Sequence, residues 1–124
     1  FHMHGGEISG FCIPQPGAGV SVNNGEFYMY GGIIQNCMSK GGTQFGGGAI
    51  WGDGNSEIHI LGGELKDNKA DNRGGAIATQ SAVAIEIKGN AKIIGNEANR
   101  GGAISIQNSS SLTITDEVEF SGNR

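Results

Sequence analysis

Few side chains in this chain could carry out chemistry: three histidines, two cysteines and two tyrosines, among 12 acidic and 8 basic residues. Polysaccharide hydrolysis would require two carboxylates within about 5–9.5 Å of each other. The acidic residues are scattered, and the sequence brings no pair of them to one face of neighbouring elements. No Ser/His/Asp arrangement and no phosphate-binding glycine loop is evident. We therefore expect no catalytic residues, no cofactor and no metal site.

The two cysteines carry a specific chemical expectation. Cys12 follows Phe11 and Cys37 follows Asn36, which are matched positions of two successive sequence repeats. Stacked strands lie about 4.8 Å apart, within the Cα separation of about 4.4–6.8 Å that a disulfide needs. We predict an inter-coil disulfide between Cys12 and Cys37, which would indicate an oxidising compartment. Two free thiols are the alternative.

Aromatic and imidazole side chains form a candidate contact face. They recur at alternate positions of matched segments, and alternate residues of a strand point to one side of a sheet. Such a face could stack on sugar rings or contact a protein, although cross-strand stacking alone would also explain it. Two neighbouring imidazoles would make only a weak metal site. The contact face comprises His2, His4, Tyr28, Tyr30, Trp51, His59 and Leu61, with Trp51 expected to be exposed.

A sequence repeat positions these residues. The tetrapeptide Gly-Gly-Ala-Ile occurs at Gly47–Ile50, Gly74–Ile77 and Gly101–Ile104, in steps of 27 residues. A second marker, a large apolar residue three positions before an asparagine, alternates with it. The glycine pairs predict sharp corners, because glycine adopts a left-handed φ without steric cost. The predicted corner glycines are Gly47, Gly48, Gly74, Gly75, Gly101 and Gly102, and the predicted asparagine ladder is Asn36, Asn68, Asn96 and Asn123.

Three short segments of each repeat alternate apolar and polar residues, which is the strand period. No helical period appears, and the repeat is shorter than a propeller blade of about 40 residues. We predict an all-β fold: a single-stranded right-handed parallel β-helix of four to five coils, each with three short strands. The handedness follows the usual crossover preference. One inward ladder is expected to contain Ile8, Ile33, Leu65, Ile93 and Phe120.

Composition excludes several classes of partner. The net charge is -4 and no basic run occurs, which disfavours nucleic acid and anionic membranes. No apolar run is long enough for a transmembrane helix. The 24 glycines have no Gly-X-Y period, which excludes collagen. Residues 1–124 would form one repeat domain.

The two markers together resemble the repeats of polymorphic outer-membrane proteins and similar glycine-rich surface passenger domains. Gly-Gly-Ala-Ile is one part of the resemblance, and Phe120-Ser121-Gly122-Asn123 gives the nearest match to the other. The resemblance covers essentially the whole chain. It implies a right-handed β-helix that is secreted or exposed on a cell surface, and often adhesive.

We therefore expect a non-enzymatic structural or adhesive segment, located outside the cell or on its surface. Neither end carries a polar cap, so the chain would belong to a longer array or stack end to end with its own copies. A self-assembling filament subunit is one alternative, and a carbohydrate-binding or carbohydrate-active module is another. The expected partners are the chain itself or a surface glycan or protein.

Overall fold

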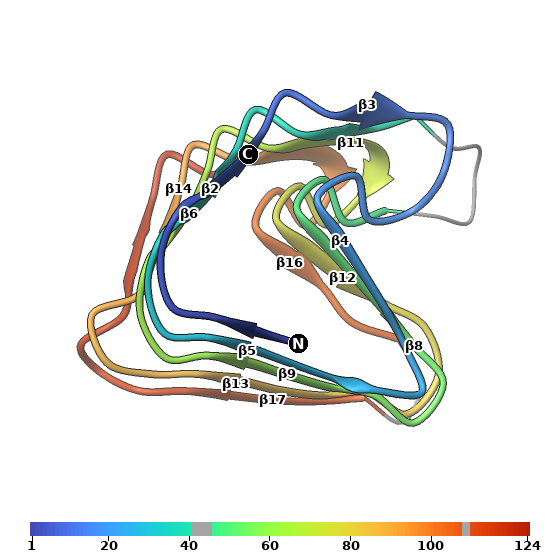
Figure 1. The fold of residues 1–124 in the computed structure, drawn as a ribbon. Helices are drawn as coiled ribbons and strands as arrows, with labels where there is room; N and C mark the ends of the chain where they lie inside the picture. Colours follow the sequence, from blue (N-terminus) through green and yellow to red (C-terminus); the bar gives the residue numbers. More distant parts are fainter. Residues whose placement is uncertain (41–45, 108–109) are drawn as a thin grey trace.

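The chain folds as a β-solenoid of stacked parallel sheets, with about four turns and a spacing of about 27 residues. The structure is a computed structural model that describes residues 1–40, 46–107 and 110–124. These residues contain no helix, and therefore none that could cross a membrane. In Figure 1 the chain turns clockwise as the coils recede from the N-terminal one, which is the sense of a right-handed solenoid. The predicted all-β parallel solenoid is confirmed.

Four parallel sheets run along the solenoid, and each strand pairs with its equivalents in the neighbouring coils (Figure 1). The first sheet contains β1 (His2–Met3), β5 (Glu26–Met29), β9 (Glu57–Ile60), β13 (Ala84–Ile87) and β17 (Ser111–Ile114). The second contains β2 (Glu7–Ser9), β6 (Ile33–Gln35), β10 (Glu64–Lys66), β14 (Lys92–Ile94) and β18 (Glu119–Ser121). The third contains β3 (Cys12–Ile13), β7 (Met38–Ser39), β11 (Lys69–Arg73) and β15 (Glu97–Arg100). The fourth contains β4 (Val20–Asn23), β8 (Ile50–Asp53), β12 (Ile77–Thr79) and β16 (Ile104–Ser105).

A coil thus has four strands instead of the three that we predicted, and the third sheet is the addition. No large apolar residue recurs at a matched position of its strands, since Ile13 pairs with Ser39, and Ser39 pairs with Ala70. In β11 and β15 the paired residues Ala70 and Ala98 are the apolar ones, and Ala70 is buried. A strand whose apolar side chain is only a methyl group has too weak an alternation to be distinguished from a turn.

Apolar ladders fill the interior of the solenoid. In the first sheet Phe27 pairs with Ile58, and Met29 pairs with Ile60. All four of these side chains are fully buried. Full burial of a side chain of this size contributes about 1.5–3 kcal/mol, so the ladders supply the main driving force for stacking the coils.

One predicted ladder is wrong in the second coil, where the alignment slips by one residue. Ile34, and not Ile33, pairs with Ile8 and Leu65 and is fully buried. Asn36 consequently occupies a turn position with φ 55°, as Asp67 does with φ 53°. Asparagine tolerates this left-handed conformation better than most residues, which is why its presence here misled the sequence alignment.

The asparagine ladder exists, with Cys37 in place of Asn36. Asn68 and Asn96 are fully buried, and Asn96 Oδ1 accepts hydrogen bonds from Asn68 N and Nδ2, both at 3.0 Å. Asn96 Nδ2 donates to Leu65 O at 2.9 Å. Asn123 repeats the arrangement one coil further on. Each amide therefore satisfies backbone groups of the preceding coil, as buried polar groups require.

Replacing Cys37 by asparagine is expected to raise the free energy of unfolding by about 1 kcal/mol, the value of one added hydrogen bond. The Cys37 thiol already lies 3.9 Å from Ile8 O. This carbonyl is equivalent to the ones that accept from Asn68 and Asn96. The added amide would donate to it and accept from the Phe11 N–H. Urea unfolding measures the change, with Cys37→Ala as the control that offers no amide. A less stable Cys37→Asn variant would contradict this account of the ladder.

The predicted corner glycines are confirmed, for two separate reasons. The first of each pair has a left-handed backbone, with φ 73° at Gly47, 62° at Gly74 and 57° at Gly101. The second glycine lies against the neighbouring coil. A Cβ on Gly75 would lie 2.3 Å from Gly102 O, so no side chain fits between these coils.

Candidate contact face and open coil end

Five rings form a stack on the outward face of the first sheet: His2, His4, Tyr28, Tyr30 and His59. We call them the ring stack. Register places His2 beside Tyr28 and Tyr28 beside His59. Ring centroids are 4.8 Å apart for the first pair and 4.5 Å for the second, with interplanar angles of 4° and 9°. His4 and Tyr30 stack similarly at 4.7 Å. These residues of the predicted face do lie together.

The stacking determines which ring faces and edges are accessible to a partner. Tyr28 is covered on one ring face by His2 and on the other by His59. A sugar ring that packs on an aromatic side chain needs an open ring face, and Tyr28 has none. Tyr28 instead presents its ring edge. Tyr30, a residue that is 41% exposed, also presents a hydroxyl, which lies 3.3 Å from His2 Nδ1. Hydrogen bonding from its ring edge is therefore the chemistry that Tyr28 can provide.

An ionic cluster borders the ring stack and was missed from the sequence. His59 Nε2 lies 3.1 Å from Glu57 Oε1, and His59 Nδ1 lies 3.2 Å from Glu86 Oε1. Glu86 Oε2 lies 2.9 Å from Lys88 Nζ. A usable signal was present, because an acid stands two residues before a basic residue in successive coils, Glu57 before His59 and Glu86 before Lys88. Register places His59 directly beside Glu86, which joins the two pairs into one cluster.

The surroundings of Glu86, Tyr28 and Glu97 shift the pKa of each group. The hydrogen bond from Lys88, followed by the one from His59, lowers the pKa of Glu86 below its ordinary value. Removal from water, followed by the negative charge of Glu26, raises the pKa of Tyr28. The hydroxyl of Tyr28 is therefore a neutral hydrogen-bonding group at neutral pH. Similarly, Lys69 and then Arg124 lower the pKa of Glu97 on the third sheet.

The fold is expected to lose stability when the pH falls below the ordinary glutamate pKa of about 4.3. Carboxylates whose pKa is lowered on folding stabilise the protein above that value, and the contribution disappears as the pH falls through the folded pKa. Glu86 and Glu97 are such groups. Thermal unfolding followed by circular dichroism should show a falling melting temperature below this pH. Glu86→Gln should make the melting temperature depend less steeply on pH. An unchanged pH profile in that variant would contradict the contribution assigned to Glu86.

Trp51 does not belong to the contact face, because it is only 4% exposed. Its side chain does point away from the solenoid interior, but the chain folds back over the outward face of the fourth sheet. A Cβ on Gly17 would lie 2.8 Å from Trp51 Cβ. The Arg73 guanidinium lies 5.5 Å from the centre of the indole. The predicted exposure of Trp51 is therefore wrong.

The predicted Cys12–Cys37 disulfide is also wrong. Both cysteines are free thiols, and Cys12 pairs with Met38. The one-residue slip in the second coil turns Cys37 inward, since successive strand side chains alternate between faces. Burial raises the pKa of the Cys37 thiol. Its Sγ donates to Gln35 O at 3.4 Å. The cysteines therefore give no argument for an oxidising compartment.

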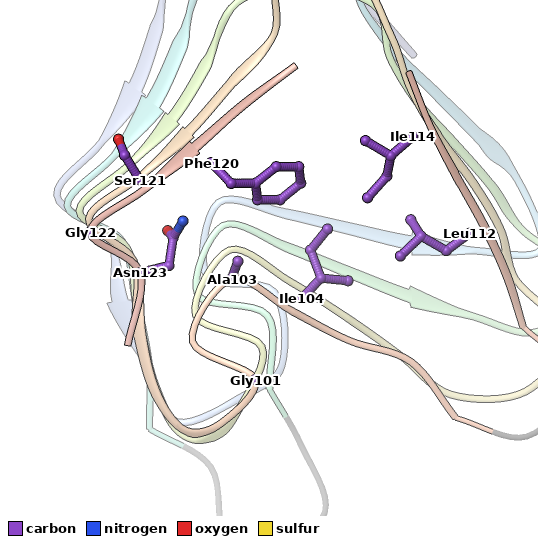
Figure 2. A pocket seen from close by; sticks show the side chains of 9 residues that line it. All are labelled: Gly101, Ala103, Ile104, Leu112, Ile114, Phe120, Ser121, Gly122 and Asn123. Atoms are coloured by element: carbon purple, nitrogen blue, oxygen red, sulfur yellow. The ribbon is translucent and has the colours of Figure 1, made fainter. Parts of the chain in front are cut away.

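The last coil of the described chain has an apolar hollow of about 510 Å³ (Figure 2). Ile104, Leu112, Ile114 and Phe120 converge on it from β16, β17 and β18. The last three are 37%, 43% and 38% exposed, whereas their equivalents one coil earlier are buried. The hollow has the shape and chemistry of the surface on which each internal coil packs. The remaining residues that line the hollow are Gly101, Ala103, Ser121, Gly122 and Asn123.

Neither the ring stack nor the hollow has the composition of a metal centre. Among the described residues, no group of three or more histidine, cysteine or acidic side chains could hold a metal ion. In comparisons with known proteins, no family model, no curated protein and no solved structure matches this chain. Its function must therefore be argued from these surfaces.

Proposed function

We propose that this chain is a structural and adhesive solenoid segment of a secreted or cell-surface protein, without catalytic activity. The observation that supports this is the unbroken parallel register of the first and second sheets through all their strands. Continuous register arranges outward side chains in straight rows, which a partner can contact over several coils. The apolar ladders occupy the interior.

The extracellular or surface location rests on the resemblance of the repeats. The free thiols of Cys12 and Cys37 remove the separate argument from a disulfide. A surface glycan or protein is the proposed partner, and the ring stack is the proposed contact. Its exposed polar edges match the polar groups of either partner.

A binding assay with matched variants tests the adhesive role. The chain is immobilised and probed with a glycan array and with intact cells. Tyr30→Ala is expected to reduce binding at least about tenfold, as the loss of a well-placed interface side chain does. Gln35→Ala, an outward change on the second sheet, is the control and should bind normally. Absence of binding to all probes, or equal binding by both variants, would contradict the adhesive role.

A filament subunit is a second candidate, because the hollow could accept the first coil of a second copy. That coil exposes Phe1 and Phe11, which are 67% and 53% exposed. One feature of such a junction is unfavourable. Phe11 occupies the coil position that Asn123 occupies in the last coil. In internal coils, the N–H at this position donates to the side-chain carbonyl of an asparagine in the next coil. At the junction the Asn123 N–H would meet Phe11 of the second copy, which has no such carbonyl. Light scattering and electron microscopy test this candidate. A monodisperse monomer at high concentration excludes it, and filaments abolished by Phe120→Asp support it.

A carbohydrate-binding or carbohydrate-active module is the third candidate. Tyr28 is closed to sugar stacking, so it would bind a sugar only through its ring edge and hydroxyl. Tyr30→Phe keeps the ring and removes only the hydroxyl, which makes it a suitable variant for the glycan array. Substitution of Trp51 is not an informative test, since this residue is buried.

A further inference from the structure

The turn between β4 and β5 contains the single Asn-Gly dipeptide of the chain, Asn24-Gly25. Asn24 is exposed and has a left-handed φ of 52°. Its backbone N–H donates to Asp53 O in the next coil at 3.3 Å. Exposed turns of this kind are the most accessible backbone of a solenoid. Asparagine is also a chemically labile side chain.

The neighbouring coil polarises the Asn24 side chain. The Asn55 N–H donates to Asn24 Oδ1 at 3.1 Å, and Asn24 Nδ2 donates to Asn23 Oδ1 at 3.1 Å. A backbone N–H directed at a carbonyl oxygen stabilises the negative charge that develops when a nucleophile attacks the carbonyl carbon. The hydrogen bond from Asn55 N–H therefore makes Asn24 Cγ more electrophilic.

The nitrogen of Gly25 is the nucleophile at hand. Glycine has no Cβ to obstruct ring closure. Among the described residues, this N–H donates to no backbone carbonyl outside the strand ladders. The related Asp53-Gly54 dipeptide differs in this respect. There the Gly54 N–H donates to Asp53 Oδ1 at 2.7 Å, which holds the proton that the nitrogen would have to lose.

We propose that Asn24-Gly25 is a self-modification site at which the folded chain deamidates. The Gly25 nitrogen gives its proton to water and attacks Asn24 Cγ, forming a new C–N bond. The Cγ–Nδ2 bond breaks, and Nδ2 takes up a proton and leaves as ammonia. Water then opens the succinimide ring at either carbonyl, which produces aspartate or isoaspartate at position 24. The reaction involves no oxidation or reduction and consumes only water.

Aspartate or isoaspartate at position 24 would weaken the turn between β4 and β5. A carboxylate replaces the Nδ2 donor that bonded Asn23 Oδ1. The isoaspartate form also lengthens the main chain beside the hydrogen bond from Asn24 N to Asp53 O. Modification would therefore loosen the contact between the first two coils, and the modified fraction should melt at a lower temperature.

Site-resolved mass spectrometry tests the proposal on the intact folded chain. The protein is incubated at mildly alkaline pH, digested and analysed for the mass increase that replacement of NH2 by OH produces. We expect Asn24 to be modified faster than every other asparagine, in two chromatographic forms. Gly25→Ala should slow the reaction at least about tenfold, which corresponds to about 1.4 kcal/mol in the barrier.

The Gly25→Ala variant should fold normally. A Cβ there would have only Asn23 O within 4 Å, at 3.8 Å, and the φ of Gly25 is not left-handed. The parent chain incubated in urea gives the rate of Asn24 deamidation in the unfolded state, for comparison with the rate in the folded chain. Modification of Asn24 in urea but not in the folded chain would overturn the proposal, because the fold would then protect the site. An equal rate in Gly25→Ala would overturn it as well.

Discussion

Replacing Asn68 by alanine is expected to lower the free energy of unfolding by about 2–5 kcal/mol, because each buried backbone group left without a partner costs about 1–3 kcal/mol. Asn68 Oδ1 accepts from Cys37 N at 3.1 Å, and Asn68 Nδ2 donates to Ile34 O at 2.9 Å. Alanine would leave both of these groups unpaired in the interior. It would also remove a donor from Asn96 Oδ1, so the change affects two coil junctions at once. Urea unfolding followed by circular dichroism measures the loss.

Asn99→Ala is the matched control for this prediction. The Asn99 side chain also bonds a backbone carbonyl of the preceding coil, with Nδ2 at 2.7 Å from Asp71 O, but this bond is exposed to solvent. Water can replace the lost partner there, so the expected loss is about 0.5 kcal/mol. Equal losses in the two variants would mean that burial of the asparagine ladder does not stabilise the stack.

The sequence predicted the first sheet well, because its strands carry large apolar residues at alternate positions. Pairs such as Phe27 with Ile58 follow directly from that pattern. The outward rows follow by the same alternation, so the ring stack could be listed residue by residue. What the pattern could not reveal is the direction in which the rings face. Their mutual stacking, which closes Tyr28 to a sugar, depends on side-chain torsions.

The missed third sheet and the misaligned second coil have different physical origins. The third sheet was missed because Ala70 and Ala98 give almost no apolar signal. The slip at Asn36 arose because asparagine suits two different places in a coil, the buried ladder and the left-handed turn. That slip reversed the side on which Cys37 lies, and the disulfide prediction failed with it.

Trp51 shows a different limit of sequence analysis. Its position was correctly predicted to point out of the interior, and its pairing with Ala78 is the expected one. Burial came from the chain folding back over this sheet near Gly17 and Gly74, which the repeat alone does not encode. Alternation identifies the face of a sheet on which a side chain lies, and only the path of the chain shows what covers that face.

Replacing Gly75 by alanine is expected to destabilise the fold by about 3 kcal/mol or more, since extra atoms forced into a packed site cost about 1–3 kcal/mol even where side chains can adjust. Here the obstructing atoms are backbone. The added Cβ would lie 2.3 Å from Gly102 O and 2.5 Å from Glu97 N. The same Glu97 N–H donates to Asn68 O at 2.9 Å. Room for the methyl group requires the next coil to move away as a unit, which would stretch that bond and the adjoining asparagine ladder.

Gly5→Ala provides the matched control, because a Cβ at Gly5 would meet nothing within 4 Å and its φ is not left-handed. Its stability should stay within about 0.5 kcal/mol of the parent chain. The two variants add the same methyl group to a glycine, so the difference between their unfolding curves isolates the contact between coils. A Gly75→Ala chain as stable as Gly5→Ala would show that adjacent coils can separate at little cost. The close coil stacking on which the solenoid scaffold depends would then not be what holds the chain together.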